Sequence, residues 1–324
     1  MYKVYDKWPE IAKKQYEMEI EHVNYDKISH IVFAGMGGSG AIGDIFASIL
    51  SKTDIHVDVI KGYHLPKTVN QHSVVVTTSI SGNTEETLNI LHEASNLQSK
   101  ILAFSDGGKM QEFCERKNIN HRKISMIHSP RASFPTFLYS MLKTFETFLP
   151  IEKKDITKSI EILEKQKNNI SSNNLENNNI ALDIAEGISG VPLIYYPWGL
   201  QAAAIRFKNS LQENCKMHAI TEDVIEACHN GIVSWSKPSS VKPIIIEGTD
   251  DHIKTKERWR ILKEFFETKE IEFKEIHSIE GDIFSKMINL IYLLDYASIY
   301  KAVLSKIDPT PVDPIEFVKQ KLIK

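Results

Sequence analysis

Two short segments of this 324-residue chain gather glycine and hydroxyl side chains in the manner of a phosphate-binding site. The first segment, GMGGSG, places Gly38 and Ser39 directly after a short apolar run. The second segment, SISGNTEET, adds three hydroxyls around a further glycine, namely Ser79, Ser81 and Thr84. At a strand–loop–helix junction, backbone N–H groups, hydroxyls and the helix dipole all favour a bound phosphate. Two such junctions predict a pocket for a phosphate monoester.

The first segment also fits a different ligand. Gly35, Gly37 and Gly40 have the G-x-G-x-x-G spacing of a dinucleotide-binding loop, and Asp54 and Asp58 follow roughly 20 residues later, where the ribose ligand is expected. A pyrophosphate loop works mainly through bare backbone. The hydroxyls of the second segment therefore favour a monophosphate, but the nucleotide alternative stays open.

The second segment has a purely structural interpretation as well. A serine or threonine of SISGNTEET can cap a helix whose first turn carries Glu85 or Glu86. Capping uses one hydroxyl and leaves the others unexplained, so both interpretations can hold together.

These segments need a scaffold that brings strand ends together, and the apolar pattern predicts one. Short apolar runs alternate with helical patterns, at 29–35, 56–62, 73–79, 101–106 and 124–130, and again at 191–196, 242–249 and 272–278. Strands that alternate with helices are typical of a parallel sheet covered on both faces. The predicted fold class is α/β, with two flavodoxin-like, three-layer domains whose mainly parallel sheets are flanked by helices.

A polar stretch separates the two halves. Residues 152–179 break the alternation, and seven asparagines fall between positions 168 and 179. We place the domain boundary there, with a first domain at 1–152 and a second at 153–324. Because the alternation restarts after Gly190, a duplicated fold is expected.

The overall composition is that of an ordinary soluble globular protein, with 42% apolar residues, 25% charged residues and a formal net charge of −3. This charge predicts neither nucleic acid nor an anionic membrane surface as a partner. No uninterrupted apolar run approaches the roughly 18 residues that cross a bilayer, and the first residues lack the apolar core of a signal peptide. The cysteines, Cys114, Cys215 and Cys228, lack C-x-x-C spacing. They argue against a disulfide framework or structural zinc and favour a reducing cytoplasm.

GMGGSG followed by TSISGNTEET resembles the sugar isomerase (SIS) domain. SPRASFPTF at 129–137, QENCK at 212–216 and CHN at 228–230 resemble one branch of that superfamily, the bifunctional phosphoglucose/phosphomannose isomerases. The resemblance covers essentially the whole chain. It implies two SIS domains, a metal-independent isomerisation without an organic cofactor, and a homodimer with the active site at its interface.

Aldose–ketose isomerisation moves a proton between C1 and C2 of a sugar through a cis-enediolate. It needs a base, an acid/base that opens the ring, and positive charge beside the enediolate oxygens. A carboxylate suits the proton transfer, and the resemblance assigns this base to Glu213. A histidine titrates near neutrality. The resemblance assigns ring opening to His229, which is contributed to the site across the dimer interface. His218, near His229 in the sequence, is the alternative residue for this role.

Arg131 follows Ser129–Pro130 at the end of a predicted strand, where α/β sheets bind ligands. A fixed guanidinium there can offset the enediolate charge, which is the role that the resemblance implies for Arg131. The family pattern usually has alanine where this chain has Ser133, a departure that the sequence does not explain.

Two residues near the carboxyl end complete the expected site. The resemblance implies an active-site lysine at Lys319, with Lys321 and Lys324 as close alternatives. It also matches Thr310 to a threonine that leaves room for a mannose-type substrate.

The expected function is therefore the interconversion of glucose 6-phosphate and mannose 6-phosphate with fructose 6-phosphate. The substrate would be held by Gly38, Ser39, Ser79, Ser81, Thr84, Arg131 and Thr310. Three alternatives remain: a non-catalytic sugar-phosphate sensor on the same domains, a nicotinamide-dependent enzyme, and an isomerase of amino-sugar phosphates.

Overall fold

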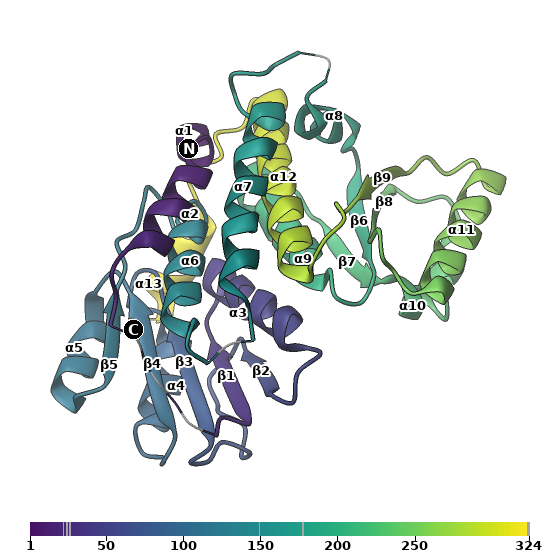
Figure 1. The fold of residues 1–324 in the computed structure, drawn as a ribbon. Coiled ribbons are helices and arrows are strands. Elements are labelled where there is room, and N and C mark those ends of the chain that lie inside the picture. Colours follow the sequence, from purple (N-terminus) through teal and green to yellow (C-terminus); the bar gives the residue numbers. More distant parts are fainter. Residues whose placement is uncertain (22, 24, 26, 149, 177, 323–324) are drawn as a thin grey trace.

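The computed structural model describes residues 1–21, 23, 25, 27–148, 150–176 and 178–322. It contains two separate β-sheets, one in each half of the chain, with helices between and around them (Figure 1). The prediction of two parallel α/β units is confirmed.

The first sheet is parallel throughout and has the strand order β2-β1-β3-β4-β5. Its strands are β1 (His30–Ala34), β2 (His56–Ile60), β3 (Ser73–Thr78), β4 (Lys100–Ser105) and β5 (Asn120–Lys123). This is the flavodoxin-like order, in which the chain reverses direction across the sheet between β1 and β3. Ligands of such sheets bind at the carboxyl ends of these two strands.

The second sheet repeats this order with one strand fewer. It runs β7-β6-β8-β9, again parallel. Its strands are β6 (Val191–Tyr196), β7 (Ile220–Asp223), β8 (Val241–Glu247) and β9 (Lys274–His277). The second half therefore has the architecture of the first, as the restart of the sequence pattern predicted.

Two strands differ from the sequence prediction, and both lie at sheet edges. β5 occupies Asn120–Lys123 and not 124–130, and β7, with the sequence ITED, was not predicted. None of the residues in these two strands is fully buried. An edge strand can be polar because one of its sides meets solvent, so apolar runs do not mark it.

Helices cover both faces of each sheet (Figure 1). The first half contains α1 (Tyr2–Tyr5), α2 (Trp8–Glu17), α3 (Gly37–Leu50), α4 (Glu85–Ala94), α5 (Gly108–Lys117) and α6 (Phe134–Phe145). The second half contains α7 (Lys153–Ile170), α8 (Ile180–Gly187), α9 (Gln201–Cys215), α10 (Val224–Ala227), a 3-10 helix (Gly231–Ser236), α11 (Ile253–Thr268), α12 (Ile283–Leu304) and α13 (Asp313–Leu322).

The two inner sheet faces share one hydrophobic core. Phe33 on β1 and Ile194 on β6 belong to the same cluster of buried side chains. Trp8 of α2 stacks on Tyr292 of α12, with ring centroids 5.4 Å apart. Because α2 and α7 also pack together, the predicted boundary at 152/153, although it falls where α7 begins, stays a prediction.

α12 is the central helix of this core. By length and composition it could cross a membrane, and it is the helix that comes closest to a bilayer-length apolar run, but 83% of its apolar window is buried inside the protein. The core helix of a soluble protein passes the same test.

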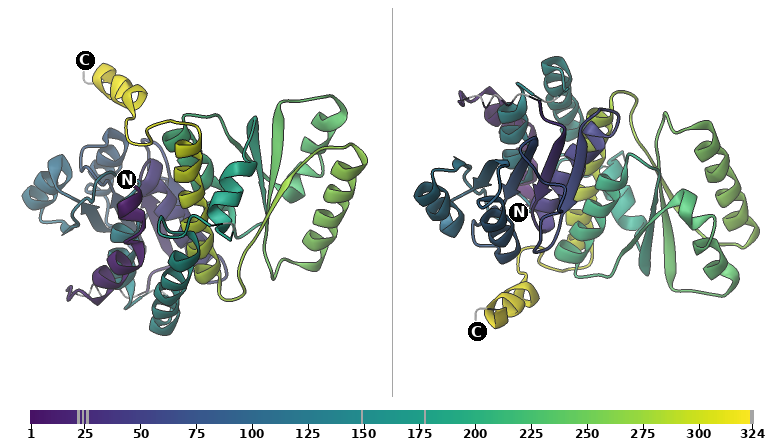
Figure 2. Two further views of the ribbon diagram at one scale, coloured as in Figure 1. Left: turned by 90° about the horizontal axis from the view of Figure 1, so that it is seen from above. Right: turned by 90° about the horizontal axis from the view of Figure 1, so that it is seen from below.

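α13 differs from every other long helix described here. It buries none of its residues and stands away from the body of the molecule in both views of Figure 2.

Candidate active site

Arg131 lies where three separate segments of the chain meet. Its side chain is almost fully buried, with the residue 5% exposed. Nε donates to Oδ1 of Asn214 over 2.7 Å, and Nη1 donates to Oε2 of Glu213 over 3.0 Å. The structure thus joins two of the predicted catalytic residues, Arg131 from the loop before α6 and Glu213 from the last turn of α9.

The third segment is the D-P-T-P loop after α12. Nη2 of Arg131 donates to the backbone oxygens of Pro309 and Thr310, the latter over 3.1 Å. Prolines lack an N–H and keep the preceding residue out of the helical region. The carbonyls of this loop are therefore free to face a cation. Thr310 consequently reaches the site through its backbone, while its own N–H donates to Oδ1 of Asp308.

Lys216 adds a second cation to the same place. Its Nζ donates to the backbone oxygen of Pro311 over 2.7 Å and to that of Glu213. Burial, and then the neighbouring charge of Arg131, lower the pKa of Lys216. Lys216 was not among the predicted site residues, although it closes the QENCK motif that carried the resemblance.

A buried ion pair holds the backbone of Arg131. Nη2 of Arg206 donates over 3.0 Å to the Arg131 carbonyl and over 2.6 Å to Oδ2 of Asp295. Ser210 donates to the other oxygen of Asp295 over 2.7 Å. The guanidinium carbon of Arg206 lies 3.8 Å from the ring centroid of Phe134. Both carboxylate oxygens of Asp295 therefore accept hydrogen bonds, as a buried carboxylate requires.

Asn214, which accepts from Arg131, is also held by hydrogen bonds. Nδ2 of Asn214 donates to Oγ of Ser298 over 2.8 Å, and Ser298 donates to the backbone oxygen of Asp295. The network therefore closes on itself, from Arg131 through Asn214, Ser298 and the α12 backbone to Arg206 and back. Such a network can give Arg131 one orientation before any substrate binds.

The hydroxyl of Ser133, where the family pattern usually has alanine, has hydrogen-bond partners in the structure. This buried hydroxyl accepts from the N–H of Ile127 over 2.7 Å and lies 2.8 Å from the backbone oxygen of Ser129, to which it can donate. An alanine could make neither bond. The hydroxyl thus fastens both ends of the turn that presents Arg131.

The first glycine segment borders this turn. α3 begins at Gly37, so Ser39 lies in its first turn rather than ahead of the helix. A Cβ built on Gly38 would lie 3.9 Å from the Cα of Arg131. Within the described part of the chain, the N–H groups of Gly37 and Gly38 have no protein acceptor. The N-terminus of α3 thus offers free donors beside Arg131.

The second glycine segment follows β3, the strand beside β1. Ser79 and Thr84 join their hydroxyls over 2.9 Å, whereas Ser81 is exposed and accepts from the N–H of Asn83. Gly82 has φ +70°, and a Cβ there would lie 1.8 Å from the oxygen of Gly107. The two segments are neighbours, because a Cβ on Gly35 would lie 3.0 Å from the oxygen of Thr78.

The acidic residues of the dinucleotide alternative lie elsewhere. The glycine segment follows the carboxyl end of β1, whereas Asp54 precedes β2 and Asp58 lies within it, paired with His30 at the amino end of β1. The carboxyl end of β2 is followed by Lys61, which pairs with Asp44. This placement gives a dinucleotide ribose no acidic ligand from those two residues.

His229 is not brought to Arg131 and Glu213 within one chain. It is exposed and follows α10, which lies beside α11 on the outer side of the second sheet (Figure 1). Among the described residues, no hydrogen bond or ion pair joins His229 to either of the two.

Lys319 is also apart from Arg131 and Glu213. Its side chain is 59% exposed, and Nζ pairs with Oε1 of Glu316 over 2.8 Å on the same helix. The assignments of His229 and Lys319 stay predictions.

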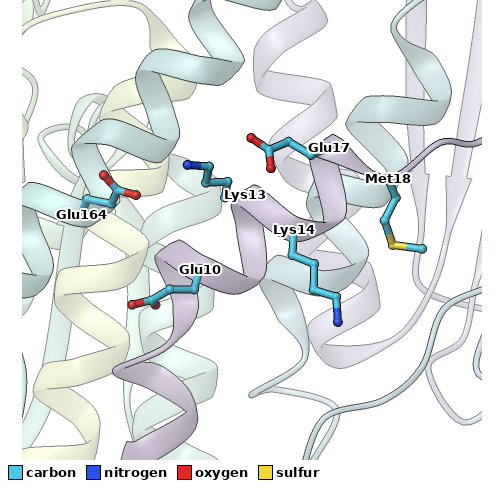
Figure 3. Close-up of a pocket in the computed structure, with 6 residues that line it drawn as sticks. All are labelled: Glu10, Lys13, Lys14, Glu17, Met18 and Glu164. Carbon is cyan, nitrogen blue, oxygen red and sulfur yellow. The ribbon is translucent and has the colours of Figure 1, made fainter.

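Two surface hollows lie outside this constellation. One, of about 460 Å³, lies between α2 and α7 and is lined by Glu10, Lys13, Lys14, Glu17, Met18 and Glu164 (Figure 3). The other, of about 300 Å³, lies between α3 and the start of α9 and includes Trp198. Neither is lined by Arg131 or Glu213.

The arrangement has a chemical meaning. The free N–H group of Gly38 lies beside the backbone of Arg131, and the carboxylate of Glu213, whose side chain is 27% exposed, lies beside its guanidinium. An anion bound at these N–H groups would lie near a carboxylate and a guanidinium.

Comparisons with family models and known proteins indicate the family of this chain. Residues 25–145 match the SIS domain, and residues 174–322 match the bacterial phospho-glucose isomerase C-terminal SIS domain. A bifunctional phosphoglucose/phosphomannose isomerase of Caldicellulosiruptor bescii is 31% identical, over 97% of this chain and 96% of that protein. A D-glucosamine-6-phosphate 4-epimerase of Sulfolobus acidocaldarius is 28% identical, over 76% and 77%.

A solved structure supports the fold. The C-terminal domain of glucosamine-fructose-6-phosphate aminotransferase from Francisella tularensis aligns with a TM-score of 0.70 at 14% identity, over 94% of this chain and 96% of that one. At this identity the likeness concerns the fold alone. Sequence identity along nearly the whole chain carries the closer assignment: the chain belongs to the bifunctional phosphoglucose/phosphomannose isomerase family.

Proposed function

We propose that this protein is an aldose–ketose isomerase that interconverts glucose 6-phosphate and mannose 6-phosphate with fructose 6-phosphate. The observation that carries the proposal is the Arg131–Glu213 pair, 3.0 Å apart, beside the glycine segment at the start of α3. The family membership supports the same reaction, because relatives of this chain bear the name bifunctional phosphoglucose/phosphomannose isomerase.

The phosphate binds the two glycine segments. Ser39 and the N–H groups of Gly37 and Gly38 meet it from the start of α3, and Ser79, Ser81 and Thr84 meet it from the loop before α4. The helix dipole of α3 adds to the attraction. Anchoring at the phosphate orients the sugar so that C1 and C2 reach the Glu213 carboxylate.

Glu213 then moves the proton. Its carboxylate removes the C2 proton of the open-chain aldose and returns it to C1, and the cis-enediolate forms in between. The guanidinium of Arg131 offsets the negative charge on the enediolate oxygens. Glucose 6-phosphate and mannose 6-phosphate share this intermediate after rotation about C2–C3. One site can therefore serve both sugars, with Thr310 bordering the sugar. No step requires a metal ion or an organic cofactor.

The site is completed by a second copy of the chain. His229 opens the sugar ring from the partner subunit, and Lys319 joins the site as α13 packs in the homodimer. Two features support this assembly. In the part of the chain that the structure describes, no hydrogen bond or ion pair joins His229 to Glu213, and α13 exposes Ile315, Phe317 and Val318. The three free thiols support a cytoplasmic location.

The deciding experiment is a coupled assay of the purified protein and its Glu213→Gln variant with both aldose phosphates. We expect kcat to fall by about 10²- to 10⁴-fold in the variant, the usual contribution of a general base. Glu264→Gln is a matched control, because Glu264 forms an Arg–carboxylate pair on the surface of α11. Full activity of Glu213→Gln would exclude Glu213 as the base.

The same preparation separates the alternatives. A sensor would bind hexose 6-phosphate without turnover, and a nicotinamide enzyme would bind NAD in a direct titration. Glucosamine 6-phosphate belongs among the assayed substrates, because a 4-epimerase of that sugar is a relative.

A further inference from the structure

Three side chains of types that bind metal ions meet near the amino ends of the strands in the first sheet. The glycine segments lie at the carboxyl ends of the strands in that sheet. The three side chains are those of His30 on β1 and of His56 and Asp58 on β2. Nothing in the proposed isomerase reaction uses them.

Their alignment follows from the strand register. His30 pairs with His56 across the parallel strands β1 and β2, so both side chains leave the sheet on one face. Asp58 lies two residues beyond His56 on β2 and therefore points to the same face. A His-x-Asp pair on one strand and a histidine on its neighbour thus present three ligands together.

The ligand atoms are already close. Oδ2 of Asp58 lies 2.9 Å from Nε2 of His30 and 3.6 Å from Nε2 of His56. All three atoms lie within 4.8 Å of one another. In a tetrahedral zinc site with bonds of about 2.0–2.1 Å, ligand atoms are about 3.3 Å apart. Small side-chain movements would therefore centre an ion among them.

The surroundings resemble those of a metal-bound histidine. Nδ1 of the buried His30 lies 3.1 Å from Oγ of Ser73 on β3. In the tautomer whose Nδ1–H donates to Oγ, Nε2 carries the lone pair that a metal ion needs, and such a second bond commonly orients a ligating imidazole. Oγ of Ser73 is itself held, because it accepts from the N–H of Asn70 over 2.9 Å.

A hydrogen bond between His30 and Asp58 would satisfy His30 alone, but it does not explain His56. The His56 side chain is 66% exposed, so water could satisfy its nitrogens in many orientations. It instead turns Nε2 toward the same carboxylate oxygen that His30 meets, with the two rings 5.1 Å apart.

We propose that His30, His56 and Asp58 bind one divalent transition-metal ion, with Zn²⁺ as the expected ion and water as its fourth ligand. Two imidazoles and a carboxylate are ligands that Zn²⁺, Co²⁺ and Ni²⁺ accept. The ion connects the edge strand β2 to β1. β1 is about 13 Å long at about 3.3 Å per residue, so the ion lies too far from the glycine segments to touch a phosphate bound there.

The test uses Co²⁺ as a spectroscopic probe of the full-length protein. Wild-type protein should take up one equivalent of Co²⁺ with visible absorption bands of a four-coordinate ion, and Zn²⁺ should displace it. His56→Ala and Asp58→Asn should each lose that equivalent. His64→Ala is the matched control, because His64 pairs with Glu93 but has no third ligand nearby among the described residues.

Thermal melts give a second readout. Zn²⁺ at about 100 times its Kd should raise the Tm of wild type and of His64→Ala, because it binds the folded state. The Tm of His56→Ala should not respond. The proposal is overturned if wild type shows no one-to-one Co²⁺ spectrum, or if His56→Ala binds and responds as wild type does. Since His56 is exposed, the variant is expected to fold.

Discussion

Nη2 of Arg206 donates a 3.0 Å hydrogen bond to the backbone oxygen of Arg131, the residue that holds Glu213. The same nitrogen donates to Asp295. A buried ion pair between α9 and α12 therefore fixes the position of the proposed catalytic arginine.

This relationship predicts a split between stability and catalysis. Arg206→Lys keeps the positive charge but removes the planar guanidinium. The lysine cannot donate to Asp295 and to the Arg131 carbonyl in the same way. We expect Arg206→Lys to lower Tm and also to lower kcat by about 100-fold, since small displacements of reacting groups cost that much. Ser210→Ala is the control. Ser210 contacts Asp295 but not Arg131, so Ser210→Ala should lower Tm and leave kcat unchanged. Equal kcat losses in both variants would refute the positioning role.

The hydroxyl of Ser133 predicts a second, milder effect on the same turn. Removing it leaves the N–H of Ile127 without its acceptor, which costs about 1–3 kcal/mol where the group stays buried. We expect Ser133→Ala to lower kcat/KM by up to about tenfold. Ser140→Ala is the control, because Ser140 lies on α6, which follows Ser133, and its hydroxyl bonds Gln15 and not the turn. Steady-state kinetics and thermal melts of both variants decide the matter.

Gly37 and Gly82, one in each glycine segment, both have a positive φ and can be compared directly. A Cβ at Gly82 would collide with the oxygen of Gly107, whereas a Cβ at Gly37 would meet nothing within 4 Å. Gly37→Ala should therefore cost only the left-handed backbone strain, about 1–2 kcal/mol. Gly82→Ala should lower Tm much further and raise KM for the sugar phosphate. Comparable Tm losses would contradict the close approach of Gly82 to Gly107.

His121 predicts a pH dependence of stability. Burial lowers the pKa of His121, and its Nε2 lies 2.8 Å from Oγ of Ser105. A histidine whose pKa is lower in the folded than in the unfolded state stabilises the fold above its unfolded pKa of about 6.5. That stability is lost as the pH falls through the folded pKa, because the unfolded chain takes up the proton first. Tm should therefore drop between pH 7.5 and pH 5.5 more for wild type than for His121→Gln. His64→Gln, at an 84% exposed side chain, should show the wild-type drop.

The sequence predicted those parts of the fold that short-range patterns encode. β1 and β3 are apolar throughout their cores and were placed correctly, as was the long buried helix α12. The polar edge strands β5 and β7 could not be found in this way, because their hydrogen bonds to a neighbour leave no apolar signature.

The site shows the same limit. The motifs indicated Arg131 and Glu213, and the structure joins them. Arg206, Asp295 and Ser298 could not be predicted, because each acts through a tertiary contact with a residue at least 75 positions away. No local spacing records such contacts. Lys216 could have been found, since it belongs to the QENCK motif.

The proposed interface site makes a prediction that one chain alone cannot satisfy. If each site combines Glu213 of one subunit with His229 of the other, Glu213→Gln and His229→Ala homodimers are both inactive. A mixed dimer has one site with both substitutions and one site with neither. Equal amounts of the two variants, allowed to exchange subunits, form mixed dimers as half of the population. Half of the sites in those dimers are intact, so about one quarter of wild-type activity should return.

The control for this experiment is the double variant Glu213→Gln/His229→Ala mixed with wild type. Its mixed dimers carry one substitution in each site, so exchange should reduce the activity below the half expected without exchange. Absence of recovery in the first mixture, with subunit exchange demonstrated by mass spectrometry, would show that His229 does not act across the interface. Because α13 exposes Phe317 and Val318, replacing both by serine should weaken the dimer and abolish the recovery at low protein concentration.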